Sequence, residues 1–367
     1  MNTIGIAIIG PGKVAHTHAR ELAALPQARL VAVCGRNQER TEAFAQQYSV
    51  RAYIDLAHLL ADGDVQAVII CTPHPQHAAQ AIAAAEAGKH VLVEKPLAIT
   101  VADCDRMIAA ARRNRVKLGV ISQRRLYPPV QRVRAAIADG KIGRPILGTV
   151  SVLGWRSPEY YTMDPWRGTW DGEGGGVLVN QAVHQLDLFQ WLMGPIEEVF
   201  GYWANLNHPT IEVDDTAIAV VRFRDGALGN IVVSNSQNPG LHGRIHIHGS
   251  NGASIGVQTE GGSMFIAGVT TEVDPPINDL WTIPGEDGLL EGWQSEDRAL
   301  GQSIDLMSHY HRLQLADFLE AIADNRPPMV PGDDGRAAVA LFEAIYRAGR
   351  EGRPIRFAEL GEAALKE

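Results

Sequence analysis

The chain has 367 residues, of which 46% are hydrophobic and 20% are charged. At ~100–200 residues per domain this length predicts two domains, and the near-average composition excludes disordered, collagen-like and coiled-coil proteins. The net charge of −9 argues against nucleic acid or an anionic membrane surface as the main partner, and no run approaches the ~18 consecutive apolar residues of a membrane helix.

Short apolar runs alternate with helical patterns over the first third of the chain, which is typical of a parallel sheet built from βαβ units. The strands expected there, most of them rich in Val and Ile, are Ile4–Ile9, Leu30–Cys34, a weaker Arg51–Tyr53, Val65–Cys71, Val91–Glu94 and Val116–Ile121. The helices expected between them are Lys13–Leu25, Glu39–Tyr48, Gln76–Ala87 and Val101–Arg113. Thr100 is expected to cap the last helix, with Asp103 three residues further on. This pattern predicts a doubly wound, NAD(P)-binding Rossmann domain over residues 1–125.

The pattern changes after Tyr127, and residues 126–367 are expected to form an α+β domain for substrate binding and oligomerisation. Strands follow one another there without intervening helices, which favours a large open, mainly antiparallel sheet. The expected elements are helix Val130–Asp139, one apolar helix Val177–Met193, strand pairs Thr216–Phe223 with Leu228–Ser234 and Ile245–His248 with Ala253–Val257, and closing helices Tyr310–Ala323 and Gly335–Arg350. The closing helices are expected to pack back towards the first domain. Residues 259–307 are rich in Gly and acids, and no element is predicted in them.

A glycine-rich turn, Gly10-Pro11-Gly12-Lys13-Val14-Ala15, joins the first expected strand to the first expected helix. Gly10 permits a tight turn, and Gly12 lets the backbone approach a pyrophosphate. Free N–H groups at Lys13 and Val14 favour anionic oxygen atoms. With its flanking strand and helix the turn predicts dinucleotide binding, whereas the same spacing alone would be only a tight turn.

The second expected strand ends without the acidic residue that usually binds the ribose 2′-hydroxyl of NAD. The residues there are Gly35-Arg36-Asn37, which we include in the cofactor site, and no acid lies between Glu21 and Glu39. Arg36 could bind a 2′-phosphate through its charge and its paired donors, or it could be a solvated loop residue. We therefore expect NAD or NADP as the cofactor, with a slight preference for NADP.

The run His90-Val91-Leu92-Val93-Glu94-Lys95-Pro96 ends an apolar strand with a charged pair. In an open α/β sheet, ligands bind outside the carboxyl ends of the strands, so Lys95 is expected to face the nicotinamide crevice. An ammonium group there can polarise a carbonyl and stabilise a developing alkoxide. Glu94 could hold the lysine or contact the cofactor ribose. The alternative is that Lys95 is merely a solvated strand end.

An apolar helix is expected after the run Gly174-Gly175-Gly176. Asn180, His184 and Asp187 are spaced i, i+4 and i+7 and therefore share one face of it. Buried polar side chains need partners, so the stripe is either a satisfied core network or a His tuned for proton transfer. The glycine run favours the second, because it would let a substrate approach the start of the helix. His184 and Asp187 alone lack the further ligands of a metal site, and no metal is expected.

Two aromatic groups precede this helix, Tyr160-Tyr161 and Trp166-Arg167. Aromatic rings stack on the apolar faces of pyranoses and Arg donates to hydroxyl groups, so Trp166 and Arg167 are substrate-binding candidates, with Gln181 beside Asn180. Core packing would explain the same aromatics equally well.

Together these residues resemble the glucose–fructose oxidoreductase, inositol 2-dehydrogenase and rhizopine-catabolism (Gfo/Idh/MocA) family of nicotinamide-dependent sugar and polyol dehydrogenases. The matching segments cover nearly the whole chain: GPGKVA at 10–15, TPHPQHA at 72–78, EKP at 94–96, WRGTWDGEGGGVLVNQAVHQLD at 166–187, FRDGALG at 223–229 and GRP at 352–354. The EKP and GGG…H…D segments are much more specific than the glycine turn.

The resemblance implies that Lys95 lies beside the nicotinamide and that His184 is the acid/base. It places four further residues near the cofactor: Thr72, Pro73, His77 and Gln123. Many members carry Asp where this chain has Asn180, so Asn180 can only orient, and Gly35 replaces the acid of NAD-preferring members. The family also implies that the open sheet forms a homodimer or homotetramer surface.

We expect an oxidoreductase that acts on a secondary hydroxyl of a sugar, glycoside or polyol. In it, His184 takes the proton, Lys95 polarises the oxygen, and Asn180 positions the ring. Two alternatives remain open: a glycosidase that uses NAD transiently, and a non-catalytic dinucleotide sensor. A pure sensor would need neither Lys95 nor His184.

Three cysteines, Cys34, Cys71 and Cys104, are too few and too scattered for a disulfide framework, and they lack metal-ligand spacing. The segment MNTIGIAIIG has no basic n-region and no cleavage site, so no secretory signal peptide is expected. These features predict a cytoplasmic protein.

Overall fold

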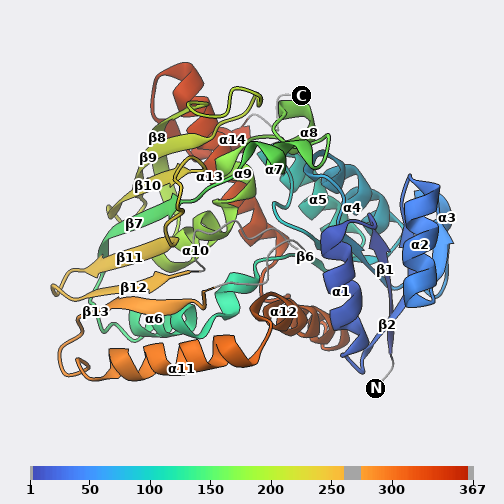
Figure 1. The fold of residues 1–367 in the computed structure, drawn as a ribbon, viewed down its shortest axis with the longest axis horizontal. Coiled ribbons are helices and arrows are strands. Elements are labelled where there is room, and N and C mark those ends of the chain that lie inside the picture. The colour runs from blue at the N-terminus through green and yellow to red at the C-terminus, as the bar shows by residue number, and fades with distance from the viewer. Residues whose placement is uncertain (1–2, 260–273, 363–367) are drawn as a thin grey trace. The chain divides into compact units, whose positions relative to one another are not determined.

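The computed structural model describes residues 3–259 and 274–362, and its chain divides into two compact units (Figure 1). Unit 1 comprises residues 1–123 and 307–336, and unit 2 comprises residues 124–306 and 337–367. The chain therefore returns to unit 1 through a late helical segment before it ends in unit 2. Each unit is described by itself below.

Unit 1 is built on a six-stranded parallel sheet with the strand order β3-β2-β1-β4-β5-β6. Its strands are β1 Ile4–Ile9, β2 Ala28–Cys34, β3 Arg51–Tyr53, β4 Ala67–Ile70, β5 His90–Val93 and β6 Leu118–Val120. The order reverses between β1 and β4, as in a doubly wound dinucleotide-binding fold. The predicted Rossmann architecture is confirmed, including the short strand at Arg51–Tyr53.

Several helices of unit 1 begin at a capping side chain. The helices of this unit are α1 Lys13–Ala23, α2 Gln38–Tyr48, α3 Leu56–Leu60, α4 His77–Glu86, α5 Val101–Arg113 and α12 Leu306–Ala323, with 3₁₀ turns at His74–Gln76 and Gln123–Leu126. Thr100 caps α5 by accepting a hydrogen bond from the N–H of Asp103, as predicted. Ile69 and Leu92 of the sheet pack with Phe318 of α12, so the core of unit 1 includes this late helix.

Unit 2 contains an eight-stranded mixed sheet with the order β13-β12-β11-β7-β10-β9-β8-β14. Its strands are β7 Pro145–Leu153, β8 Ile196–Ala204, β9 Thr216–Phe223, β10 Leu228–Ser234, β11 Arg244–Gly249, β12 Ser254–Gln258, β13 Ile277–Trp281 and β14 Ile355–Arg356. Only β7 and β10 pair in parallel. Both predicted hairpins, β9–β10 and β11–β12, are confirmed as antiparallel pairs.

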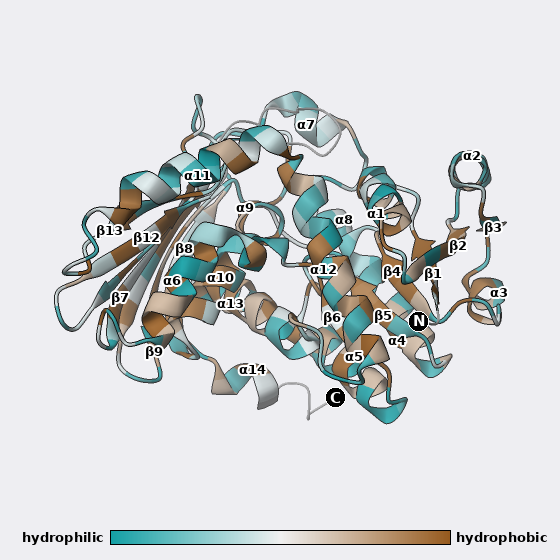
Figure 2. Ribbon diagram, turned by 90° about the horizontal axis from the view of Figure 1, so that it is seen from below, coloured by the Kyte–Doolittle hydropathy of each residue, from teal (hydrophilic) through white to brown (hydrophobic). Residues whose placement is uncertain are grey.

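The remaining helices are α6 Pro128–Ala138, α7 Pro158–Thr162, α8 Trp170–Glu173, α9 Val177–Asn180, α10 Val183–Met193, α11 Leu289–Ser303, α13 Gly332–Glu351, which starts in unit 1, and α14 Ala358–Glu362. Of these, α6, α9, α10 and α11 contact the long strands of this sheet. In Figure 2, α6 and α10 run along the same face, and both contact strands of the sheet. Along β9 buried and exposed residues alternate, as expected for a sheet that packs on one face only.

Two expectations need correction. The single helix expected at Val177–Met193 is wrong, because the chain forms α9 and α10 with a break at residues 181–182. Within the segment that had no assignment, β13 and the whole of α11 are present, while residues 260–273 lie outside the described part of the chain.

Among residues 3–259 and 274–362, no helix combines the length and the apolar character needed to cross a bilayer.

Candidate active site

The glycine turn lies at the carboxyl end of β1, beside the end of β4. Gly10 has a φ of +95°, and a Cβ atom there would come within 2.8 Å of the Thr72 side chain. Any larger residue would be strained and would also push into the loop after β4. The sequence therefore has glycine at position 10 for two independent reasons.

The start of α1 is open towards a ligand. A Cβ atom on Gly12 would have only the carbonyl oxygen of Cys71 nearby, at 3.9 Å, so the space over the turn is free of protein atoms. No side chain caps α1, and its first N–H groups at Lys13 and Val14 have no acceptor within the helix. This arrangement fits the pyrophosphate of a dinucleotide, which binds where free N–H groups and the helix dipole favour negative charge.

The end of β2 has no room for an acidic side chain. A Cβ atom on Gly35 would lie 2.5 Å from Pro11 and 2.7 Å from the hydroxyl of Thr41. Arg36 and Arg40 are both exposed, and neither has an ion pair with another described residue. Asn37, the third candidate here, caps α2 by accepting from the N–H of Arg40 at 2.9 Å.

Glu94 and Lys95 follow β5 at the carboxyl edge of the sheet. The buried carboxylate of Glu94 accepts hydrogen bonds from Nε2 of His18 at 2.7 Å and from the backbone N–H of Lys95 at 3.2 Å. Nε2 of His311 lies 4.0 Å from the same carboxylate, and its Nδ1 donates to the carbonyl oxygen of Met307. Burial would raise the pKa of Glu94, but the hydrogen bond from His18 and the surrounding positive charges lower it to about 2. An ionised, anchored carboxylate thus fixes the backbone of Lys95.

The residues that hold Glu94 were not singled out from the sequence. His18 lies on the apolar side of α1 and His311 lies on α12, almost 300 residues apart in the sequence. The ligand atoms of His18, Glu94 and His311 all lie within 4.8 Å of one another. Because the closest contact is a hydrogen bond to the carboxylate, we assign the three residues to the positioning of Lys95.

His77 joins the loops that follow β4 and β5. Its ring is fully buried, and its nitrogens lie 2.8 Å from the carbonyl oxygen of Thr72 and 2.9 Å from that of Pro96. Pro73 stands between Thr72 and the 3₁₀ turn that leads into α4. His77 therefore acts on the site by holding these two loops. Gln123 is also buried, and its side-chain oxygen has no hydrogen-bond partner among the described residues.

In unit 2 the break between α9 and α10 separates Asn180 from His184. The N–H of Ala182 donates to the carbonyl oxygen of Val177 at 2.8 Å, which is the i to i−5 spacing of a π-type turn. The expectation that Asn180, His184 and Asp187 share one regular helix face is therefore wrong. Such turns in helices occur frequently at functional sites.

Asp187 has a charged partner that the sequence analysis did not single out. Its carboxylate accepts two hydrogen bonds from Arg125, from Nε at 2.8 Å and from Nη2 at 2.6 Å. Both side chains are almost completely buried. Asp187 thus belongs to a buried ion pair that fixes α10 one turn after His184, which is itself 9% exposed.

The glycine run before α9 is required by protein contacts. A Cβ atom on Gly176 would lie 1.8 Å from the carbonyl oxygen of Asp214, and one on Gly175 would lie 2.4 Å from the hydroxyl of Tyr346. Asp214 also accepts from the N–H of Gly176 at 2.8 Å and from the hydroxyl of Tyr346 at 2.6 Å. The expectation that the glycines make room for a substrate is not supported by this packing.

The hydroxyl of Tyr160 gathers the predicted substrate residues. Its oxygen accepts hydrogen bonds from Nδ2 of Asn180 at 3.0 Å, from Nε2 of Gln181 at 3.1 Å and from Nη1 of Arg167. The guanidinium of Arg167 lies 4.3 Å from the centre of the Tyr160 ring and 4.5 Å from that of Trp166. The structure therefore brings together Trp166, Arg167, Asn180 and Gln181 around the Tyr160 side chain.

Glu173 is a further member that sequence reasoning missed. It is 1% exposed, and its carboxylate accepts from the N–H of Gly168 at 2.7 Å and from Nδ2 of Asn180. Because both donors of the Asn180 amide point at Tyr160 and Glu173, its carbonyl oxygen is directed away from them. A carboxylate is thus present next to Asn180, although position 180 itself carries none.

Two profiles of known protein families match this chain. One, described as the oxidoreductase family with an NAD-binding Rossmann fold, matches residues 4–122, and the other, the GFO/IDH/MocA C-terminal domain, matches residues 130–255. The chain belongs to the Gfo/Idh/MocA family of oxidoreductases. Its first domain is an NAD-binding Rossmann domain, and its relatives include dehydrogenases of sugars and polyols.

Several Gfo/Idh/MocA proteins resemble this chain over almost its full length. Myo-inositol 2-dehydrogenase of Thermotoga maritima is 28% identical over 97% of this chain and 99% of its own. The 1,5-anhydro-D-fructose reductase of Ensifer adhaerens is 29% identical over 88% of this chain and 90% of its own. The WlbA dehydrogenase of Bordetella pertussis, solved with NADH and UDP-GlcNAcA, is 32% identical over 97% of this chain and 98% of its own, with a TM-score of 0.85.

Proposed function

We propose that this Gfo/Idh/MocA protein is an NAD(P)-dependent dehydrogenase or reductase of a secondary hydroxyl group in a sugar, a glycoside or a polyol. The observation that carries the proposal is the anchoring of Lys95 by Glu94 at the carboxyl end of β5. In open α/β sheets this edge is where ligands bind, and the open glycine turn after β1 belongs to the same edge.

The chain's own residues have distinct tasks in this proposal. His184 removes the proton from the substrate hydroxyl during oxidation and returns it during reduction. The ammonium group of Lys95 stabilises the negative charge that develops on the same oxygen. The nicotinamide ring, when bound, accepts or supplies the hydride. Asn180 and Trp166, with Gln181 and Arg167, orient the sugar ring.

The names of the relatives support this substrate class, since they include an inositol dehydrogenase and an anhydrofructose reductase. The direct test is a screen of neutral and acidic sugars, glycosides and inositols with NAD and NADP separately, followed by the absorbance of the reduced nicotinamide. We expect cofactor reduction with at least one carbohydrate class. If none of these compounds reduces NAD or NADP, and no keto sugar oxidises NADH or NADPH, the proposal is contradicted.

The adenosine end of the cofactor site favours NADP(H) in our proposal. Gly35 leaves no acid to bind a 2′-hydroxyl, and the exposed Arg36 and Arg40 offer two guanidinium groups to a 2′-phosphate. We predict that Arg36→Ala combined with Arg40→Ala lowers kcat/KM for NADP by roughly 10- to 100-fold, the usual size of charge-assisted hydrogen bonds, and changes kcat/KM for NAD little. Steady-state kinetics measures both values. Arg113→Ala, an exposed change at the end of α5, is the control, and an equal loss with both cofactors would refute the preference.

The open face of the eight-stranded sheet is the proposed contact between copies of this chain. Tyr202, Ile218, Val220 and Leu228 are exposed on the adjacent strands β8, β9 and β10, and Tyr202 pairs directly with Ile218. Large apolar patches of this kind on a protein surface mark interaction sites. A homodimer or homotetramer would bury them.

Ile218→Lys combined with Val220→Lys should therefore convert the oligomer into a monomer, because both charges would lie within the contact. Light scattering during gel filtration measures the mass. Leu289→Lys, which also places a charge at an exposed apolar residue but on α11, should leave the mass unchanged. If the wild-type protein is itself a monomer, the proposed interface does not exist.

A cytoplasmic location is part of the proposal. All three cysteines are buried free thiols, whereas structural disulfides are characteristic of oxidising compartments.

A further inference from the structure

We infer that Arg156 of unit 2 binds an anionic group of the substrate, so that the preferred carbohydrate carries a carboxylate. This inference deepens the proposed function and rests on it. Arg156 lies between β7 and α7, in a segment for which the sequence analysis predicted no role.

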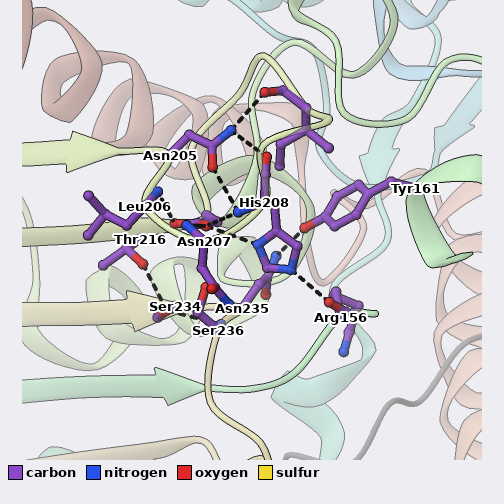
Figure 3. Close-up of polar contacts among 12 residues, drawn as sticks. Arg156, Tyr161, Asn205, Leu206, Asn207, His208, Thr216, Ser234, Asn235 and Ser236 are labelled. Carbon is purple, nitrogen blue, oxygen red and sulfur yellow. Dashed lines mark hydrogen bonds and ion pairs between the residues drawn. The ribbon is translucent and has the colours of Figure 1, made fainter. Parts of the chain in front are cut away.

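The backbone of Arg156 is fixed on both sides. Its N–H donates to the carbonyl oxygen of Asn235 at 3.0 Å, and its carbonyl oxygen accepts from Nε2 of His208 at 2.8 Å (Figure 3). The other ring nitrogen of His208 lies 2.9 Å from the carboxylate of Asp215, which also accepts from the N–H of Asn207 at 2.7 Å. A buried network therefore holds the residue from which the guanidinium extends.

The side chain is held as well. Nη1 donates to the carbonyl oxygen of Trp155 at 2.8 Å, and the guanidinium carbon lies 5.3 Å from the centre of the Tyr160 ring. Cation–π contacts and hydrogen bonds of this kind restrict the rotamers of a long side chain before a ligand arrives. Less conformational entropy is then lost on binding.

The charge and one donor of this ordered guanidinium remain unmatched. Nε of Arg156 is buried without a hydrogen-bond partner, and no carboxylate among the described residues forms an ion pair with Arg156. Arg167, which lies over the same Tyr160 ring, differs in this respect because its Nε lies 3.4 Å from Asp164. A buried N–H group without an acceptor is costly, and a guanidinium that lacks a carboxylate partner suits charge-assisted hydrogen bonds to an oxyanion.

The location connects this group to the sugar-binding residues. The ring over which Arg156 lies belongs to Tyr160, whose hydroxyl accepts from Asn180 and Gln181. The nearby carboxylate of Glu173 is already engaged with the N–H of Gly168 and with Asn180. An anionic group at Arg156 would thus belong to the molecule whose hydroxyl groups Asn180 orients. The planar carboxylate matches the planar guanidinium in shape, and a sugar phosphate is the other negatively charged group that a sugar could offer to it.

The test compares D-glucose, D-glucuronate, glucose 1-phosphate and UDP-glucuronate with the wild-type enzyme and with Arg156→Gln and Arg156→Lys. We expect kcat/KM for the carboxylated sugars to exceed that for glucose by on the order of ten- to a hundredfold in the wild type. Arg156→Gln should abolish this preference through KM, with kcat almost unchanged, because the contact is remote from the reacting carbon. Arg156→Lys should retain part of it. Arg144→Gln, which removes an exposed guanidinium of unit 2, is the matched control.

The outcomes separate this inference from the proposed function. A preference for glucose, or an unchanged preference in Arg156→Gln, overturns the anionic site while the dehydrogenase proposal stands. A preference for glucose 1-phosphate over D-glucuronate would show that the anionic group bound by Arg156 is a phosphate and not a carboxylate. If no sugar reduces the cofactor, calorimetric binding of D-glucuronate that is lost in Arg156→Gln still supports the site, and its absence in the wild type refutes it. Thermal unfolding verifies that each variant is folded.

Discussion

Lys95→Ala and His184→Ala should each reduce kcat by about a hundredfold to ten-thousandfold, with a smaller effect on cofactor binding. General acid–base groups contribute roughly 10²–10⁴ to rate, and a donor that stabilises a developing oxyanion contributes about 10²–10³. Rapid-mixing measurement of nicotinamide reduction gives the rate of the chemical step, and fluorescence titration gives the affinity for the cofactor. If the two residues act on one oxygen, the double variant should lose much less than the product of the two single losses.

The pH dependence distinguishes the two roles. The limb of the kcat/KM profile that reports the base should disappear in His184→Ala and persist in Lys95→Ala. Lys13→Ala serves as the control, since this lysine is exposed at the start of α1 and is assigned only a backbone contact. Full activity of the Lys95→Ala, His184→Ala double variant would exclude the proposed chemistry.

Release of an aglycone without accumulation of reduced cofactor in the wild type would indicate the glycosidase alternative.

The Rossmann half of the fold was predictable because its signals are local. Apart from β3, the strands of unit 1 are short, largely apolar runs, and Thr100 caps α5 as the sequence suggests. Strand order follows from the rules of right-handed βαβ connections. The closing helix α12 was expected to pack towards the first domain, but its individual contacts were not predictable, because Phe318 and Leu92 of the same core are more than 200 residues apart.

The second half was less predictable because its determinants are not local. Residues 177–193 are mostly apolar, and their hydrophobic pattern gives no sign of the π-type turn at Ala182. The glycines before α9 were correctly recognised as exceptional, but their cause, the approach of Asp214 and Tyr346, involves residues 38 and 170 positions away from Gly176.

The candidate site also contains residues that could be predicted from the sequence and residues that could not. Gly10, Gly12 and Lys95 could be placed from the sequence because strand ends define the ligand edge of a parallel sheet. Their supporting residues could not, since His18 and His311 reach Glu94 only through the tertiary fold. In unit 2, Arg167 remains a predicted sugar ligand, and its contact with Tyr160 was not predictable from the sequence.

The buried Arg125–Asp187 pair makes the strongest prediction about stability. Asp187→Ala would leave a guanidinium that is 3% exposed without its carboxylate, and breaking a buried pair in this way costs roughly 3–5 kcal/mol of unfolding free energy. Denaturant unfolding measures the loss. Glu359→Ala, which breaks the exposed pair with Arg353, should change the unfolding free energy little.

Replacing both partners tests the physical reason. Arg125→Met combined with Asp187→Leu removes the two charges together and should recover most of the stability lost in Asp187→Ala, since neither charge of the pair is left buried without the other. If the cost instead came from the shape of α10, the double variant would be as unstable as the single one. Activity adds an independent measurement, because Asp187 lies one helical turn after His184 on α10. A stable double variant with reduced kcat would show that the ion pair orients the helix that carries the acid/base, whereas an unchanged kcat would limit the pair to stability.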